Sequence, residues 1–466
     1  MTEDRIRPRE RDAVIQSLRA GVVPHSGQHH IQVGRIDEVQ ALVGDISRIA
    51  DGGSAIRFVI GEYGSGKTFF LQLIRAVALE KRLVTLHADL GPDRRLHATG
   101  GQARGLYAEL TRNMATRAKP EGGALSGVVE RFVSQALARA KEFGASTESV
   151  IHSRLAELSE LTGGYDFAEV IARYWLGYET GNEQLKSDAL RWLRGEFATR
   201  TDARQALGVR TIVDDANFYD QLKLLGLFVT QAGFDGLLVC LDEMVNLYKL
   251  ANTQARNANY EQILRILNDC LQGSAAHLGF VFGGTPEFLT DTRRGLYSYA
   301  ALQSRLAENT YAAEGLVDHS GPVLRLSSLS PEDFYVLLNK LRHVYAAGDP
   351  AAYLIPDEAI EAFMEHCSSR IGDAYFRTPR NTITQFINLL AVLEQNPGVD
   401  WRRLIGDVDI PDDVNPDLLP LDEEESEGSG GKVQTGAFRG YGAPAGAGAD
   451  PARASHGDDD LATFRL

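Results

Sequence analysis

Residues 61–68, GEYGSGKT, combine residue types that bind phosphate. They fit the pattern G-x-x-x-x-G-K-[ST], in which the backbone amides of a glycine-rich loop surround the phosphates of a nucleotide. In that pattern Lys67 reaches the β- and γ-phosphates and the hydroxyl of Thr68 holds Mg²⁺. The alternative, a flexible glycine turn, leaves a lysine at the start of a helix without a role. The stretch therefore predicts a nucleotide site.

The predicted contacts with the nucleotide extend over the whole loop. The glycines permit backbone angles and close approaches that a Cβ atom would prevent. The helix that follows the loop directs its N-terminal amides at the same place, which favours an anion. We expect nucleotide contacts from Gly61, Glu62, Tyr63, Gly64, Ser65, Gly66, Lys67, Thr68 and Phe69.

Two adjacent carboxylates end the apolar run LLVCLDEM. In nucleotide hydrolases with such a loop, an acid at a strand end helps hold Mg²⁺, and a neighbouring acid orients or deprotonates the attacking water. Asp242 fits the first role, together with Thr68, and Glu243 fits the second. The alternative, two surface acids after a strand, is disfavoured because the phosphate loop independently requires such a partner. The pair favours hydrolysis over transfer to a small acceptor.

Thr285 follows another apolar run that ends in two glycines. A polar residue at this place can lie between Glu243 and the water that attacks the γ-phosphate. Thr285 can also cap the helix that begins at Pro286, since threonine is a common N-cap. The two roles are compatible.

Several arginines follow and are candidates for contact with the transferred phosphate. The stretch DTRRGLYSYAALQSRL contains Arg293, Arg294 and Arg305, and such an arginine often comes from a neighbouring subunit. The residues themselves do not choose among these three. Arg377 and Arg380 begin a later helix that could close over the phosphates, although each is also a plausible surface arginine.

The elements that must position these residues form an α/β pattern. A strand ends at residue 60 and a helix begins at Lys67, and further strands are expected at 82–90, 236–241, 277–283 and 323–326. The strand–helix–strand order and the nearly continuous apolar runs predict a parallel sheet. Residues 104 to about 232 have helical periodicity without strand runs, which predicts a helical insertion.

These patterns divide the chain into six segments. After residue 329 a helix-start signature and further helical periodicity predict a small helical lid. From residue 411 the sequence is acidic and then rich in glycine, alanine and proline, so it cannot bury enough apolar surface to fold. Its last residues, DDDLATFRL, are either a docking motif or an inert tail. The predicted segments are 1–50, an N-terminal helical part; 51–103, the first part of the nucleotide-binding core; 104–232, the insertion; 233–328, the rest of the core; 329–410, the lid; and 411–466, the tail.

Composition is that of a soluble globular protein, with 44% hydrophobic and 24% charged residues. The net charge of −15 gives no electrostatic case for non-specific binding of nucleic acid by the whole molecule. A local basic face remains an alternative to an ordinary solvated helix face, which the charge pattern favours. The basic face would comprise Arg191, Arg194, Arg200, Arg204 and Arg210.

The sequence also indicates a compartment. No apolar run is long enough to cross a membrane, and the charged N-terminus lacks the apolar core of a signal peptide, so we expect a cytoplasmic protein. Cys240, Cys270 and Cys367 are far apart, which suits core thiols in a reducing compartment and argues against a zinc site. His29 and His30 have no further ligand at metal spacing and are interpreted as surface histidines.

The order of phosphate loop, LDE, polar strand end, downstream arginine and helical lid resembles the AAA+ ATPases, particularly the replication initiators and loaders. The stretch VGRIDEVQ is similar to the adenine-side motif of that branch, which implies nucleotide contacts from Gly34 and Arg35. The resemblance also implies that Thr285 is the polar sensor, Arg305 the arginine finger and Arg380 the lid sensor. ATP and Mg²⁺ are the implied ligands.

A more specific resemblance covers nearly all of the chain before the tail. The strings GEYGSGKTFFL, WLRGE, LDEMVNLYKL, NYEQIL, GGTPEFLTDTRRGLYSYAALQSRLA and TPRNTI resemble the ATP-binding proteins of BREX-type bacteriophage-defence loci. This resemblance implies an ATPase that works beside a helicase or other defence components on DNA. The leading hypothesis is an ATPase that oligomerises and remodels or loads such a partner on DNA. An ATP-dependent switch with slow hydrolysis is the first alternative, and a small-molecule kinase is a weaker one.

One departure from the initiators bears on DNA binding. Their lid is usually followed by a winged-helix domain, whereas here the acidic tail follows almost at once. Any DNA contact would therefore come from the AAA+ surface or from the insertion, through its basic residues and Trp192. For Trp192 a place in the core is favoured over a base-stacking role.

Overall fold

The computed structural model describes residues 6–311, 318–371 and 379–406, without the side chains of residues 370 and 371. The predicted tail, its final motif at 458–466 and Arg377 lie outside the described residues. Within the described part, no helix has both the length and the apolar character needed to cross a membrane.

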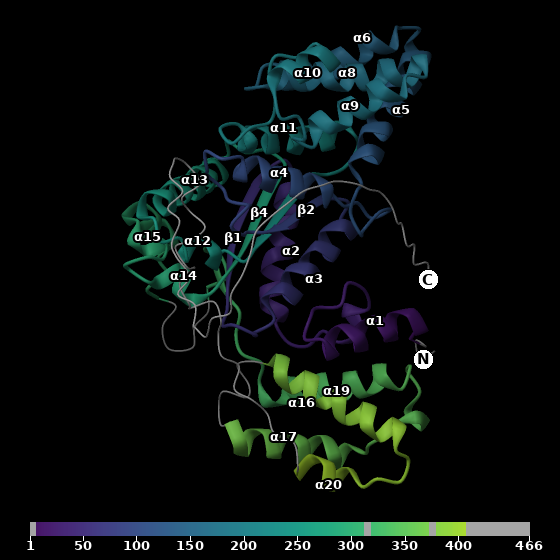
Figure 1. Ribbon diagram of the computed structural model, residues 1–466, viewed down its shortest axis with the longest axis vertical. Coiled ribbons are helices and arrows are strands. Elements are labelled where there is room, and N and C mark those ends of the chain that lie inside the picture. The colour runs from purple at the N-terminus through teal and green to yellow at the C-terminus, as the bar shows by residue number, and fades with distance from the viewer. Residues whose placement is uncertain (1–5, 312–317, 372–378, 407–466) are drawn as a thin grey trace, which may run out of the picture. The chain divides into compact units, whose positions relative to one another are not determined.

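A parallel five-stranded sheet lies at the centre of the fold, with the strands in the order β2-β3-β4-β1-β5 (Figure 1). The neighbouring strands pair in parallel. The predicted parallel sheet is confirmed, and it is consistent with a P-loop nucleotide-binding protein. The strands are β1 (Ser54–Ile60), β2 (Val84–Asp89), β3 (Leu237–Asp242), β4 (Leu278–Gly284) and β5 (Val323–Arg325).

The carboxyl ends of β1, β3 and β4 meet at one edge of the sheet, because the strands are parallel. The phosphate loop leaves the end of β1, Asp242 is the last residue of β3, and Thr285 directly follows β4. The register supports this edge, since Gly284 of β4 pairs with Ile60 of β1. Three segments that are far apart in the sequence are therefore brought together by topology alone.

Two cores cover the two faces of the sheet. One face packs against α2 (Ile36–Ala50) and α3 (Lys67–Glu80), through residues such as Leu42, Ile46 and Ile74. Every residue of β1 and β4 is buried, which explains why these strands are nearly continuous apolar runs. The other face belongs to a larger core that also includes Tyr107 and Phe228 from the helices between β2 and β3.

The segment between β2 and β3 is helical in the structure. Its helices are α4 (Gln102–Arg112), α5 (Leu125–Phe143), α6 (Thr147–Arg154), α7 (Ala156–Ser159), α8 (Gly164–Thr180), α9 (Glu183–Leu193), α10 (Arg200–Leu207) and α11 (Phe218–Gln231). Arg191 pairs with Asp188, and Arg200 pairs with Asp214, so these two members of the basic set are engaged with acids of the same segment.

Trp192 lies inside the core of this helical segment. Its side chain is 1% exposed, and its indole N–H donates to the carbonyl of Thr211 at 2.8 Å. The ring makes an edge contact with Phe167. The core interpretation is therefore confirmed, and Trp192 does not offer a face on which a base could stack.

Several helices follow β3 and β4, of which all but α13 (Thr253–Leu271) are short. The helix α12 (Val245–Tyr248) follows Asp242, and Thr285 is the N-cap of α14 (Pro286–Thr290). The other elements here are the 3-10 helix η2 (Leu296–Ser298) and α15 (Ala300–Leu306).

A third core joins the N-terminal helix to the C-terminal helices. Val14 of α1 (Pro8–Arg19) is fully buried with Leu338, Phe363 and Phe386. Ser330 begins α16 with a capping box, as the helix-start signature predicts. The other elements here are η1 (Gln28–His30), η3 (Pro350–Ala352), α16 (Pro331–Tyr345), α17 (Asp357–Ile371), α19 (Pro379–Gln395) and α20 (Trp401–Gly406).

Hydrogen bonds fix α1 to this C-terminal group of helices. The Arg11 guanidinium donates to the carbonyl of Tyr345 at 2.7 Å, and the Thr384 hydroxyl donates to the carbonyl of Leu18 at 3.0 Å. By contrast, α2 packs on the sheet. The first 50 residues thus contribute to two different cores.

The three cysteines are buried free thiols, as the sequence predicts. Burial raises the pKa of Cys240, Cys270 and Cys367 to about 12 each. Thiols with such pKa values stay protonated at neutral pH and are poor nucleophiles.

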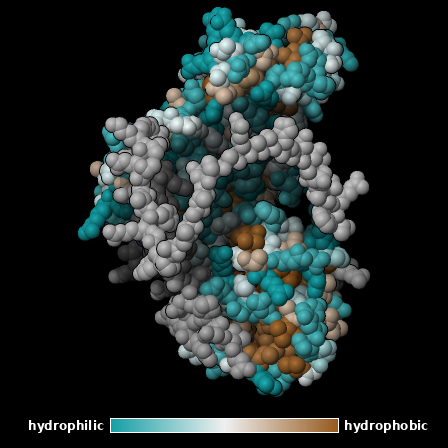
Figure 2. Space-filling model, viewed as in Figure 1, coloured by the Kyte–Doolittle hydropathy of each residue, from teal (hydrophilic) through white to brown (hydrophobic). Residues whose placement is uncertain are grey.

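Hydrophobic side chains on the surface are scattered rather than gathered on one element. The face in Figure 2 is mainly hydrophilic, with separate hydrophobic patches among its described residues. Examples of exposed hydrophobic residues come from three different helices: Ile36, Phe143 and Tyr165. Single exposed hydrophobic residues are normal for a globular protein.

His87 on β2 gives the fold a predicted sensitivity to acid. Burial and the nearby charges of Arg75 and His25 lower the pKa of His87 to about 4. The unfolded chain binds this proton with a pKa of about 6.5, so the free energy of unfolding falls as the pH drops from about 6.5 to about 4, by up to about 3 kcal/mol from this residue.

Urea unfolding of the wild type and of His87→Gln between pH 7 and pH 4.5 tests this expectation. The variant is expected to lose less stability over this range than the wild type. His152→Gln, at a site on α6, is the control and should match the wild type. Equal pH dependence of all three proteins would contradict the assignment to His87.

Candidate nucleotide site

The loop between β1 and α3 has the conformation that its glycines predict. Gly64 (φ 73°) and Gly66 (φ 85°) adopt the left-handed region. Gly66 is the N-cap of α3 and provides no side chain to cap the first amides of the helix. The Ser65 hydroxyl is buried and has no hydrogen-bond partner among the described residues. The loop therefore offers donors to an anion at a helix N-terminus.

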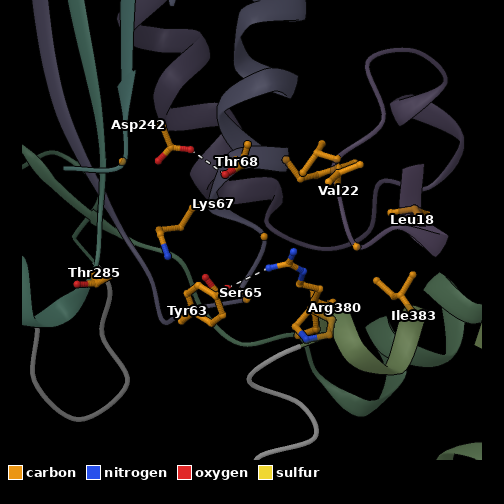
Figure 3. Close-up of a pocket in the computed structure, with 18 of the residues that line it drawn as sticks. Leu18, Val22, Tyr63, Ser65, Lys67, Thr68, Asp242, Thr285, Arg380 and Ile383 are labelled. Atoms are coloured by element: carbon orange, nitrogen blue, oxygen red, sulfur yellow. Dashed lines mark hydrogen bonds between the residues drawn. The ribbon is translucent and has the colours of Figure 1, made fainter. Parts of the chain in front are cut away.

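Lys67 is held over this loop. Its Nζ donates to the carbonyls of Gly61 and Glu62, at 2.9 Å each. The Lys67 side chain extends from the start of α3 toward Tyr63 and Thr285 (Figure 3). The amine is thus held close to the place where the β- and γ-phosphates would lie in a P-loop.

Thr68 and Asp242 make direct contact. The Thr68 hydroxyl donates to Asp242 Oδ2 at 2.7 Å, and Asp242 Oδ1 accepts from the backbone N–H of Glu243 at 2.9 Å (Figure 3). Asp242 is buried. A hydroxyl and a carboxylate oxygen are the ligand types that Mg²⁺ prefers, so the two residues fit a magnesium site.

Glu243 adopts an uncommon backbone conformation. Its φ of 56° lies in the left-handed region, which costs about 1–3 kcal/mol for a residue with a side chain and clusters at functional sites. Its side chain is exposed and lines the same cavity as Lys67 and Thr68. The turn after β3 therefore separates the two acids. Asp242 is buried in contact with Thr68, and the exposed side chain of Glu243 faces the cavity.

Thr285 caps α14, because its hydroxyl accepts from the N–H of Phe288 at 3.5 Å. It is buried and also lines the cavity. The capping role that the sequence predicts is thus present. Because Thr285 lines the same cavity as Glu243, its position is compatible with the second predicted role, contact with the attacking water.

Arg35 contacts the phosphate loop itself. Its guanidinium donates to the carbonyl of Ser65 at 2.6 Å and lines the cavity. Burial lowers the pKa of Arg35, although the charges of Glu38 and Asp333 oppose this shift. Gly34 (φ 60°) lies against the Asp333 side chain rather than on the cavity wall.

Arg380 reaches the cavity from the start of α19. Its Nη1 donates to the Tyr63 hydroxyl at 3.1 Å, so the helix touches the phosphate loop (Figure 3). It also packs against Gly21, where an added Cβ would lie 3.0 Å from the arginine Nε. Gly21, near the N-terminal end of the described chain, and Arg380, near its C-terminal end, therefore both line the cavity.

The three described candidates from the earlier stretch, Arg293, Arg294 and Arg305, do not line this cavity. Arg305 Nε donates to Asn268 at 2.8 Å, and its guanidinium is exposed on α15. Arg294 donates to the carbonyls of Lys249 and Leu250. Arg293 is exposed. The structure does not bring these arginines to the phosphate loop of their own chain.

The cavity has an apolar part that sequence reasoning missed. The whole cavity has a volume of about 390 Å³, within the usual range for small-molecule sites, about 300–1,000 Å³. The apolar wall comes from the N-terminal region, from Phe69 and from the C-terminal segment: Leu18, Val22, Val23, Ile31, Val33, Phe69, Leu329, Leu337 and Ile383. The one sequence signal was the apolar pair Val22-Val23 in a polar stretch, and Val22 remains 53% exposed.

Asp89 is a second residue that sequence reasoning did not single out. It ends β2 and is the register partner of Asp242. Burial and the charge of Asp242 raise the pKa of Asp89. Its place at a strand end beside a predicted metal ligand was the available signal.

Comparison with protein families gives one extensive match. The model of the family described as BREX system ATP-binding protein BrxC/D matches residues 6–409. The matched region contains the phosphate loop, all five strands and every residue of the cavity wall. No curated protein matches the chain.

Proposed function

The chain belongs to the BREX system ATP-binding protein family, and from this we propose that it is a Mg²⁺-dependent ATP hydrolase that acts in bacteriophage defence. The observation that carries the proposal is the contact between Thr68 and Asp242. It joins the phosphate loop to the end of β3 at 2.7 Å and leaves Glu243 facing the same cavity. This combination is what hydrolysis of a nucleotide needs.

Each residue of the site receives one role. Thr68 and Asp242 would hold Mg²⁺, which neutralises charge on the β- and γ-phosphates. Lys67 would bind the same phosphates in place of the carbonyls of Gly61 and Glu62. Glu243 would orient the attacking water and accept its proton.

The base and the lid complete the proposed complex. Adenine would lie on the apolar wall between the N-terminal residues and the C-terminal helices, because a planar base gains most from burial there. Arg380 would leave Tyr63 and contact the phosphates. Arg35 would keep the loop in shape through Ser65, and Thr285 would fix the water against Glu243.

We place the protein among the AAA+ ATPases and propose that it oligomerises. Arg305 is exposed and lies outside the cavity of its own chain, which suits an arginine that completes the site of a neighbour. Arg294 is a weaker candidate because it binds carbonyls within its own chain. The assembled ATPase would remodel or load a partner, such as a helicase, on DNA in the cytoplasm.

Arg305→Ala is expected to reduce ATP hydrolysis by about 10³-fold or more while ATP binding persists, because the arginine stabilises charge only in the transition state. Arg293→Ala is the matched control and should retain activity. Steady-state hydrolysis and binding of a fluorescent ATP analogue measure the two effects.

Mixing two inactive variants tests whether this arginine acts between subunits. Arg305→Ala protomers have an intact Glu243, and Glu243→Gln protomers supply an intact Arg305. Mixed oligomers should therefore recover part of the activity. If co-assembled variants remain inactive, Arg305 does not complete a neighbour's site.

The function itself is tested by steady-state hydrolysis over a range of protein concentrations, with Mg²⁺ or EDTA and with or without duplex DNA. Activity per protomer that rises with concentration, requires Mg²⁺ and increases with DNA supports an oligomeric motor on DNA. If EDTA abolishes activity but neither protein concentration nor DNA changes it, the result supports the magnesium site and not the oligomeric motor. No hydrolysis above the Glu243→Gln blank under any condition would overturn the proposal.

A second candidate function is an ATP-dependent switch with slow turnover. It is favoured by the cavity wall, which residues of the phosphate loop share with Leu337 and Ile383 of the C-terminal helices. A bound nucleotide would therefore hold the two together. Partner binding that requires ATP but persists in Glu243→Gln would favour the switch over the motor.

A further inference from the structure

Glu10, His29 and His30 form a cluster of metal-ligating side chains away from the nucleotide cavity. Glu10 lies on α1, and the two histidines lie on η1. His30 Nε2 is 3.3 Å from Glu10 Oε2, and the candidate ligand atoms of all three residues lie within 4.8 Å of one another. The two imidazole rings are 3.9 Å apart between centroids. The expectation that the two histidines have no further ligand nearby is therefore wrong, because the fold places Glu10, a third candidate ligand, beside them.

The backbone around η1 holds this cluster in place. Gly27 begins η1 with a φ of 78°, and a Cβ added there would lie 2.8 Å from Val14 Cγ2. Glycine tolerates the positive φ and has no Cβ to collide with Val14. Gly27 therefore lets η1 approach α1 closely. The buried side chain of Gln28 donates to the carbonyl of Pro24 at 2.7 Å and contacts Gln72 of α3. The ligands thus sit on elements that are fixed on two sides.

The spacing suits a tetrahedral metal ion. With bonds of about 2.0–2.2 Å, neighbouring ligand atoms of a tetrahedral zinc site lie about 3.3–3.6 Å apart. The separation of 3.3 Å between His30 and Glu10 has this value without any movement. Two imidazoles with one carboxylate leave a fourth position for water, and imidazole favours zinc over magnesium or calcium.

We propose that Glu10, His29 and His30 bind one Zn²⁺ ion. The ion would tie α1 to η1, the two elements on either side of Val22 and Val23 in the wall of the nucleotide cavity. Because α1 also packs on the C-terminal helices, the site would stabilise the arrangement of three segments. The proposal concerns metal binding and does not depend on ATP hydrolysis.

The test uses the full-length chain without a histidine tag, loaded with Co²⁺ as a spectroscopic probe and then titrated with Zn²⁺. The wild type is expected to bind one Co²⁺ per chain with visible absorption of a tetrahedral site, and Zn²⁺ should displace it. Glu10→Gln and His29→Asn should each weaken Co²⁺ binding at least tenfold. His25→Asn, a histidine of the same segment outside the cluster, is the control and should bind as the wild type does.

A second measurement separates metal binding from damage to the fold. Without metal, Glu10→Gln should unfold at nearly the same temperature as the wild type, since one partly exposed ion pair contributes little. Excess Zn²⁺ should raise the unfolding temperature of the wild type and of His25→Asn but not of Glu10→Gln. Absence of stoichiometric binding in the wild type, or equal binding and equal shifts in every variant, would overturn the proposal.

Discussion

Glu243→Gln is expected to lower the rate of ATP hydrolysis by about 10²–10⁴-fold and to leave the affinity for ATP nearly unchanged, because a general base contributes to the transition state and little to ground-state binding. The geometry favours this separation. Glu243 faces the cavity from an exposed position, whereas Asp242 contacts Thr68. Glutamine keeps the size of the side chain and removes only its basicity.

The measurement pairs steady-state hydrolysis with equilibrium binding of a fluorescent ATP analogue. Glu261→Gln, on α13 and outside the cavity, is the matched control and should behave as the wild type. If Glu243→Gln hydrolyses ATP at the wild-type rate, another group activates the water, and Asp89 at the end of β2 becomes the next candidate.

Lys67→Ala is expected to weaken ATP binding by about 10–100-fold, since a hydrogen bond to a charged group is worth about 1.5–3 kcal/mol. Hydrolysis should fall further, because the lysine also stabilises charge on the transferred phosphate. The amine is already positioned at the loop by the carbonyls of Gly61 and Glu62. Little reorganisation is therefore needed before it binds phosphate.

Titration with the same fluorescent analogue measures this loss. Lys81→Ala removes an exposed lysine at the opposite end of α3 and serves as the control for loss of a positive charge. Circular dichroism should be the same for both variants. Unchanged nucleotide affinity in Lys67→Ala would place the phosphates elsewhere and would remove the basis of the assigned site.

Together the two variants separate binding from chemistry. If Lys67→Ala loses ATP binding and Glu243→Gln loses only ATP turnover, one site contains both the residue that binds the phosphates and the residue that activates water. The Thr68–Asp242 contact connects these functions, because it joins the helix that carries Lys67 to the strand that precedes Glu243.

Much of the fold and of the phosphate side of the site could be predicted from the sequence. The strand, loop and helix around residues 54–80 follow from short-range patterns, because backbone angles and apolar periodicity depend on residues a few positions apart. The two adjacent carboxylates at the end of β3, Asp242 and Glu243, could be predicted for the same reason. Their meeting with the phosphate loop follows once the strands are known to be parallel.

The apolar wall of the cavity could not be predicted in this way. It combines residues from positions 18 to 33 with Leu337 and Ile383, and no local pattern encodes a contact between segments that far apart. The contact of Arg380 with Tyr63 and that of Arg35 with Ser65 are of the same kind. The resemblance to AAA+ proteins indicated that some of these residues matter, but not what they touch.

The sequence by itself determined the chemistry that the loop can perform, since phosphate binding depends on residue types at fixed short spacing. Only the tertiary structure decided which distant side chains share that chemistry. Trp192 entered the core, and the histidine pair at positions 29 and 30 gained Glu10 as a neighbour. The physical reason is that burial and side-chain proximity are set by packing of the whole chain, which lowers free energy through contacts that no single segment contains.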